Sequence, residues 1–113
     1  MGLIRMSGIK DFQKMMREIY YDRDVERGLY RSALWLISEI GELVDAIVKG
    51  DAEALNKEAA DAMAWLCSVC NLLEVYLEKV VYERYNQHCP RCGESPCECP
   101  KEWEKHEQRN CWP

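Results

Sequence analysis

Two pairs of carboxylates stand at helical spacing near the middle of this chain: Glu39 with Glu42, and Glu58 with Asp61. The members of each pair are three residues apart, so on an α-helix both carboxylates of a pair lie on the same face. Between the pairs, Gly50 and Asp51 predict that one helix ends and the next begins. Helices joined by so short a link are antiparallel neighbours, and this arrangement can bring the two pairs together.

The residues around these carboxylates are mostly apolar. The stretch 32–48 has only acids as charged residues, the stretch 58–73 has only Glu58 and Asp61, and neither contains a Lys or Arg. A helix that is apolar nearly all round is expected to be buried. Buried carboxylates without a basic partner must be protonated or bind a cation. Oxygen ligands suit Mg²⁺ or Mn²⁺, which also bind substrate phosphates, so we expect such an ion at Glu39, Glu42, Glu58 and Asp61.

Ordinary solvated charges are the alternative, because most acids at this spacing lie on exposed helix faces. Asp45 continues the spacing of the first pair and could serve either purpose.

The rest of the sequence predicts an all-α protein, an antiparallel helical bundle, since no convincing strand alternation is present. Ser7 is a plausible N-cap for a first helix over residues 8–22, and the polar stretch 22–30, which contains Gly28, predicts a loop. A second helix is expected over 30–49. A third is expected over 52–85, and it is long enough that it could be kinked or split.

Composition limits the class of protein. The chain has 113 residues, 48% of them apolar or aromatic, and a formal net charge of -5. One domain with a modest core is expected, and oligomerisation would help to stabilise it. The net charge does not favour a stable nucleic-acid partner or an anionic membrane. Since neither a signal peptide nor a membrane span is recognisable, we expect a cytoplasmic protein.

A cysteine-rich tail follows the helical body. We place the boundary between residues 1–87 and 88–113, where prolines and cysteines begin. The tail offers four closely spaced thiols: Cys89, Cys92, Cys97 and Cys99. The first pair is Cys-x-x-Cys followed by glycine, which is typical of a zinc-binding turn, and four thiolates could complete a tetrahedral site for structural zinc.

The second cysteine pair is Cys-x-Cys, which departs from common zinc ribbons. His88, His106 and Cys111 are spare ligands, and disulfides or free redox thiols remain alternatives. Cys67 and Cys70 stand in an apolar helical segment, where we expect them to pack in the core.

The run LWLISEIGELVDAI, followed after a short turn by EAADAMAWL, resembles the MazG-like all-α nucleoside triphosphate pyrophosphohydrolases over residues 10–87. The resemblance implies a helical bundle that assembles into homodimers or homotetramers. It also implies metal-dependent hydrolysis of a (d)NTP between the α- and β-phosphates, giving a nucleoside monophosphate and pyrophosphate. Glu39 would be the general base, with Glu42, Glu58 and Asp61 as metal ligands.

Substrate contacts are predicted at a few further residues. Trp35 lies near the first acidic pair on a helical wheel and could stack on a base, or it could be a core or interface tryptophan. Lys57, Arg84, Asn86 and Arg31 could reach phosphate, or they could be solvated polar residues. The stretch VVYERYNQH departs from the Lys/Asn pattern expected of relatives. Two other functions stay open: a non-enzymatic helical interaction protein with a zinc tail, and a phosphoribosyl-ATP type of pyrophosphohydrolase.

Overall fold

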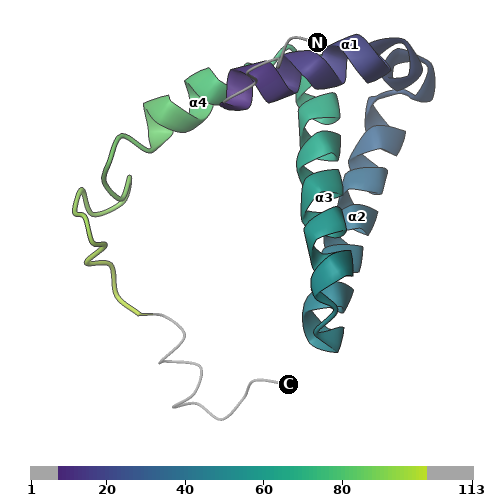
Figure 1. The fold of residues 1–113 in the computed structure, drawn as a ribbon. Coiled ribbons are helices and arrows are strands. Elements are labelled where there is room, and N and C mark those ends of the chain that lie inside the picture. The colour runs from purple at the N-terminus through teal and green to yellow at the C-terminus, as the bar shows by residue number, and fades with distance from the viewer. Residues whose placement is uncertain (1–7, 102–113) are drawn as a thin grey trace, which may run out of the picture. The chain divides into compact units, whose positions relative to one another are not determined.

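The structure, a computed structural model, describes residues 8–101 and is all-α, as predicted (Figure 1). Its four helices are α1 (Ile9–Arg27), α2 (Leu29–Lys49), α3 (Ala52–Leu73) and α4 (Leu77–Arg84). The chain divides into two compact units, residues 1–80 and 81–113. The boundary predicted after residue 87 falls inside the second unit.

Helices α2 and α3 form an antiparallel hairpin, which is the element that holds both acidic pairs (Figure 1). Gly50 ends α2 in the left-handed conformation, with φ 67° and ψ 28°, and its amide donates to the carbonyls of the last turn. Asp51 then caps α3 by accepting a hydrogen bond from the Ala54 amide at 3.1 Å. The predicted helix stop and N-cap are therefore both confirmed.

Helix α1 is longer than predicted and packs across the end of the hairpin (Figure 1). The loop expected over residues 22–30 was wrong: the helix continues to Arg27, and only Gly28, with φ 90°, separates it from α2. Two of the polar residues that suggested a loop are paired inside the helix, since Arg27 donates to Asp24 at 2.9 Å. Ser7 lies outside the described residues, and Gly8 occupies the N-cap position without a side-chain cap.

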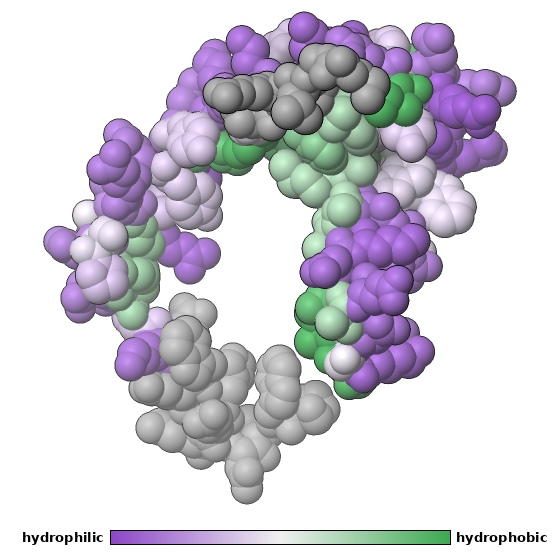
Figure 2. Space-filling view, viewed as in Figure 1, coloured by the Kyte–Doolittle hydropathy of each residue, from purple (hydrophilic) through white to green (hydrophobic). Residues whose placement is uncertain are grey.

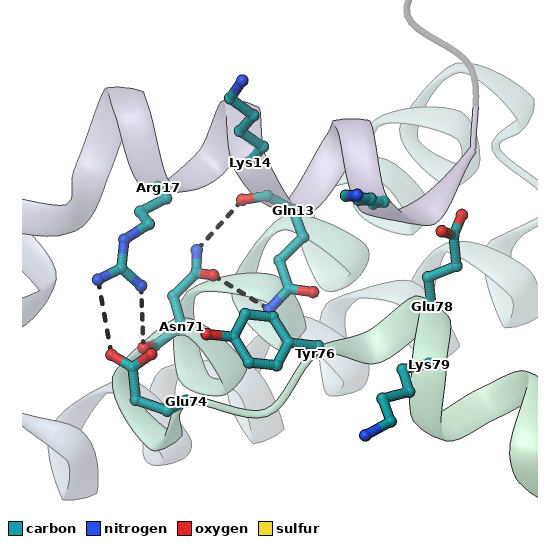
Figure 3. Close-up of a pocket in the computed structure, with 9 residues that line it drawn as sticks. Gln13, Lys14, Arg17, Asn71, Glu74, Tyr76, Glu78 and Lys79 are labelled. Carbon is teal, nitrogen blue, oxygen red and sulfur yellow. Dashed lines mark hydrogen bonds and ion pairs between the residues drawn. The ribbon is translucent and has the colours of Figure 1, made fainter.

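The expected third helix is split. Glu74 adopts the left-handed conformation with φ 56° and ends α3, and α4 begins at Leu77. Buried Gln13 of α1 stabilises this turn, because its amide donates to the Val75 carbonyl at 2.8 Å and accepts from the Leu77 amide at 2.9 Å. Gln13 also donates to buried Asn71 at 3.1 Å (Figure 3).

Replacing Gln13 with Ala would leave two backbone groups of this turn without partners. An unsatisfied polar group that stays buried costs about 1–3 kcal/mol, so we expect Gln13→Ala to lower the free energy of unfolding by about 2–4 kcal/mol. Urea denaturation measures the loss, and Lys14→Ala, at the exposed neighbouring position, is the control. Equal stability of the two variants would contradict the role given to Gln13.

The core lies where α1 crosses α3. Met16, Cys67, Cys70 and Leu77 are buried there, with Phe12 and other apolar side chains packed around them. In Figure 2 the outward side of α1 is mostly hydrophilic, and hydrophobic residues lie beneath it against the end of the hairpin. The core position predicted for the two cysteines is confirmed, and burial raises the pKa of the Cys67 thiol to about 11.

Helix α2 differs from its predicted burial. Only Ser32 and Ala46 of this helix are buried, so the expectation of a helix buried all round was wrong for the single chain. A row of exposed apolar residues, here called the α2 stripe, runs along its outer face: Tyr30, Leu34, Ile37, Val44 and Val48.

Among residues 8–101 no single helix has both the length and the apolar composition of a membrane span. Helices α3 and α4 meet these two criteria only when they are counted together as one bent segment.

Candidate functional site

Three of the four predicted carboxylate ligands meet on the hairpin. Glu39 of α2 and Glu58 and Asp61 of α3 each offer an oxygen, and these oxygens all lie within 4.8 Å of one another. Glu42, one turn beyond Glu39, is exposed and is not part of this set. Its carboxyl nevertheless interacts with that of Glu39. We call Glu39, Glu58 and Asp61 the acidic cluster.

The acidic cluster contains carboxylate oxygens that lack partners. Oε2 of Glu39 and Oε2 of Glu58 are buried, and neither has a hydrogen-bond partner within the described part of the chain. Burial, together with the neighbouring Glu58 and Glu42 carboxyls, raises the pKa of Glu39 to about 7. Buried acceptor oxygens beside one another require a proton or a cation between them.

One part of the sequence interpretation needs correction, because the cluster does have a basic neighbour. Lys57, the residue immediately before the charge-poor stretch, lies with its Nζ 3.0 Å from Asp61 Oδ2 and 3.3 Å from Glu58 Oε1. This ammonium is largely exposed, so the ion pairs are worth little to stability. They also leave the two buried oxygens of Glu39 and Glu58 unpaired.

The donor set suits a hard divalent cation. Mg²⁺ prefers oxygen ligands at about 2.0–2.1 Å, which places ligand oxygens about 3–4 Å from one another. Three carboxylate oxygens within 4.8 Å are close to that spacing. The unpartnered buried oxygens supply the negative charge that such an ion would neutralise, so the residues present fit the predicted metal.

Two tryptophans lie one turn along the hairpin from the acidic cluster. Trp35 precedes Glu39 by four residues and Trp65 follows Asp61 by four, and their rings stack at 5.8 Å between centroids and 14° between planes. The Arg27 guanidinium lies 4.6 Å from the centroid of the Trp65 ring. Trp35 therefore contacts another tryptophan and keeps about half of its surface exposed.

The end of α1 supplies residues that the sequence interpretation missed. Asp24 is almost fully buried and pairs with Arg27, whose guanidinium also donates to Ser32 Oγ at 3.3 Å. A cavity of about 150 Å³ reaches from this corner to the cluster, and its lining includes Arg27, Trp65 and Asp61. The acid and base at three-residue spacing within residues 22–30 could have signalled a helix here.

Other predicted residues have simpler surroundings. Asp45 forms an exposed ion pair with Lys49 at 2.9 Å. Arg31 lines a shallow cavity of about 270 Å³ together with Trp35. Arg84 belongs to the second unit, where its guanidinium lies 5.8 Å from the Tyr85 ring centroid.

A larger cavity of about 600 Å³ lies at the turn between α3 and α4, and Figure 3 shows its lining. It contains none of the acidic cluster. Its polar groups include the Gln13–Asn71 pair and the Arg17–Glu74 ion pair, which hold the helices together. We therefore assign the chemistry to the smaller cavity beside Asp61.

The raised pKa of Glu39 predicts how stability depends on pH without divalent metal. Between pH 4.5 and about 7 the folded protein keeps a proton on Glu39 that the unfolded chain releases, so stability falls as pH rises through this range. Glu39→Gln removes this effect. The variant should melt a few degrees above wild type at pH 8 in Mg²⁺-free buffer, by roughly 2–5 °C, and show no advantage at pH 4.5 or below.

Thermal unfolding of both proteins at the two pH values measures this difference. Asp45→Asn, which changes an exposed acid on the same helix, is the matched control. An advantage of Glu39→Gln that is the same at both pH values would contradict a Glu39 carboxyl that titrates near neutrality.

The tail brings its four predicted cysteines together. The sulfur atoms of Cys89, Cys92, Cys97 and Cys99 all lie within 4.8 Å of one another. Hydrogen bonds from the backbone amides of Cys92 and Arg91 lower the pKa of Cys89 to about 6. His88 is exposed, and its Nδ1 lies 3.4 Å from the Cys89 carbonyl, while His106 and Cys111 lie outside the described residues.

Comparison with known proteins places the hairpin in a family. The profile of the MazG nucleotide pyrophosphohydrolase domain matches residues 29–93, which is more than half of the chain and includes α2, α3, α4 and the acidic cluster. A search of curated proteins finds no match. The helical fold, the two acidic segments on adjoining helices and this match agree, and the chain belongs to the MazG nucleotide pyrophosphohydrolase domain family.

Proposed function

We propose that this protein hydrolyses nucleoside triphosphates to nucleoside monophosphate and pyrophosphate, with Mg²⁺ or Mn²⁺ held by the acidic cluster. The observation that carries the proposal is the pair of buried, unpartnered oxygens on Glu39 and Glu58, beside Asp61 on the adjoining helices. Family membership supports the reaction class.

Each residue of the cluster has a proposed role. Glu58 and Asp61 hold the metal ion. Glu42, whose carboxyl interacts with that of Glu39, is a further metal ligand or an acid beside the ligand set. When bound, the ion would neutralise charge on the phosphate oxygens and lower the pKa of a bound water. Glu39 is proposed to orient the attacking water and take its proton, and a pKa near 7 suits a general base at neutral pH.

Basic and aromatic residues around the cluster would hold the nucleotide. The exposed Lys57 ammonium is already at the cluster and could turn from Asp61 to a phosphate oxygen. A base could stack on the exposed face of Trp35, with Arg31 beside the same cavity. Arg27 lines the cavity that reaches Asp61. Its guanidinium is a further hydrogen-bond donor to phosphate that the sequence did not suggest.

We also propose that the active form is a homo-oligomer in which α2 packs against α2 of a second copy. The stripe residues follow a spacing of four and three, and Gly41 continues that spacing between Ile37 and Val44. Among the described residues, nothing outside the neighbouring backbone of α2 lies within 4 Å of the position of an added Gly41 Cβ, so a second helix could approach closely there. The stripe carries no charge, so the same surface on another copy is a complementary partner.

A substrate panel tests the proposed reaction. Purified full-length protein is incubated with the common ribo- and deoxyribonucleoside triphosphates and with phosphoribosyl-ATP, with Mg²⁺, and pyrophosphate release is measured. The proposal expects release from at least one nucleoside triphosphate and loss of release with chelator. Activity on phosphoribosyl-ATP alone would favour that substrate class, and inactivity on the whole panel would favour the interaction protein.

A further inference from the structure

The described part of the second unit lacks an apolar core. None of residues 82–101 is buried, and the region has no helix beyond the end of α4. Chains this short rarely fold without a disulfide or a metal ion. The segment that contains the cysteines nevertheless has defined turns, so another interaction must hold it together.

Sulfur positions in this segment match a metal site. Cys89 Sγ lies 3.7 Å from Cys99 Sγ, and Cys92 Sγ lies 3.9 Å from Cys97 Sγ. Zinc–sulfur bonds of about 2.3 Å in a tetrahedron place neighbouring sulfurs about 3.8 Å apart. A disulfide would require about 2.05 Å, so these pairs are spaced as ligands around a common centre and not as bonded pairs.

The backbone around the thiols is arranged for thiolate ligands. The Glu98 amide donates to Cys92 Sγ and the Cys99 amide donates to Cys97 Sγ, both at 3.3 Å. The first Cys-x-x-Cys segment closes into a turn through the bond from the Gly93 amide to the Cys89 carbonyl at 2.8 Å. Gly93 has φ 77°, a conformation that glycine adopts without strain.

We propose that Cys89, Cys92, Cys97 and Cys99 bind one zinc ion in a tetrahedral four-sulfur site, and that this ion holds residues 89–99 in their fold. The proposed site is separate from the acidic cluster in both ligand chemistry and position in the sequence. Its four thiolates complete the coordination, so the site has no open position for a substrate and its role is structural.

Metal analysis of the full-length protein, purified under reducing conditions without added chelator, tests the site. We expect one zinc ion per chain, and we expect Cys97→Ser to lower the zinc content by about tenfold or more. Cys111→Ser is the matched control and should keep its zinc, because the four thiols already complete the tetrahedron. Iron in place of zinc, zinc retained by Cys97→Ser, or disulfides among these four cysteines would overturn the proposal.

Cobalt provides a second readout that does not depend on enzyme activity. The metal-free reduced protein, titrated with Co²⁺, should develop the intense sulfur-to-metal absorption of a tetrahedral thiolate site, and Zn²⁺ should remove it. Cys97→Ser should lose this absorption, while Glu58→Gln should keep it. Helix content by circular dichroism checks that each variant is folded, and an absorption that depends on Glu58 would contradict the assignment to the tail.

Discussion

Replacing Glu58 with Gln, or Asp61 with Asn, should reduce Mg²⁺-dependent pyrophosphate release to background. Both changes keep the size of the side chain and remove the charge that a cation requires. Changes in residues that merely orient metal ligands cost 10–100-fold, so loss of a proposed ligand should lower kcat/KM by on the order of 10²-fold or more. Steady-state assays across a Mg²⁺ series measure the loss.

Two controls make this result specific. Asp45→Asn changes an exposed acid of α2 that pairs with Lys49, and it should keep activity within about twofold of wild type. Thermal unfolding should show that Glu58→Gln and Asp61→Asn remain folded. Full activity of either cluster variant at low Mg²⁺ would contradict its role as a ligand.

A charge in the middle of the α2 stripe should separate the proposed oligomer into monomers. Ile37 is 66% exposed in the single chain and lies next to Gly41 on the same face. In an α2–α2 contact, Ile37→Asp would bury an unpaired carboxylate, which is strongly unfavourable. We expect wild type to elute as a dimer or larger assembly and Ile37→Asp to elute as a monomer, measured by size-exclusion chromatography with light scattering.

Val25→Asp is the matched control for this experiment. Val25 is 54% exposed on α1 and does not belong to the stripe, so the same substitution there should leave the assembly unchanged. A monomeric wild type, or an Ile37→Asp variant that assembles as wild type does, would contradict the proposed interface.

The hairpin could be predicted from sequence because its signals are local. Gly50 in the left-handed conformation and the Asp51 cap involve residues within one turn of each other. The break between α3 and α4 has no such signal, because Glu74 adopts a left-handed conformation and the turn depends on Gln13, more than sixty residues away in sequence. Only the folded structure brings Gln13 to that turn.

Apolar patterning predicted a buried α2, but it could not predict whether this helix would be covered by its own chain. A uniformly apolar α2 is consistent with burial inside one chain or between two, and the described chain leaves its stripe exposed. The spacing of the carboxylates predicted that both pairs would meet, and Glu39, Glu58 and Asp61 do so while Glu42 lies outside the set. It could not predict Lys57 beside them, since a flexible side chain just outside a segment can still reach into it.

The pair of Asp24 and Arg27 at the end of α1 was missed for a related reason. A polar run that ends in glycine commonly marks a loop, but here Asp24 is buried and pairs with Arg27 one helical turn away, inside α1. The result positions Arg27 over Trp65, next to the cluster. The contact between Arg27 and Trp65 joins residues far apart in the sequence, so no local motif predicts it.

Product analysis decides whether the acidic cluster releases pyrophosphate from a nucleoside triphosphate. Wild-type protein is incubated with Mg²⁺ and its best nucleoside triphosphate, and the products are quantified by ³¹P NMR, with identically purified Glu58→Gln as the blank. The proposed reaction predicts nucleoside monophosphate and pyrophosphate in equal amounts, formed by wild type and not by the blank. Nucleoside diphosphate and phosphate as the products, or equal turnover by Glu58→Gln, would contradict pyrophosphate hydrolysis at the acidic cluster.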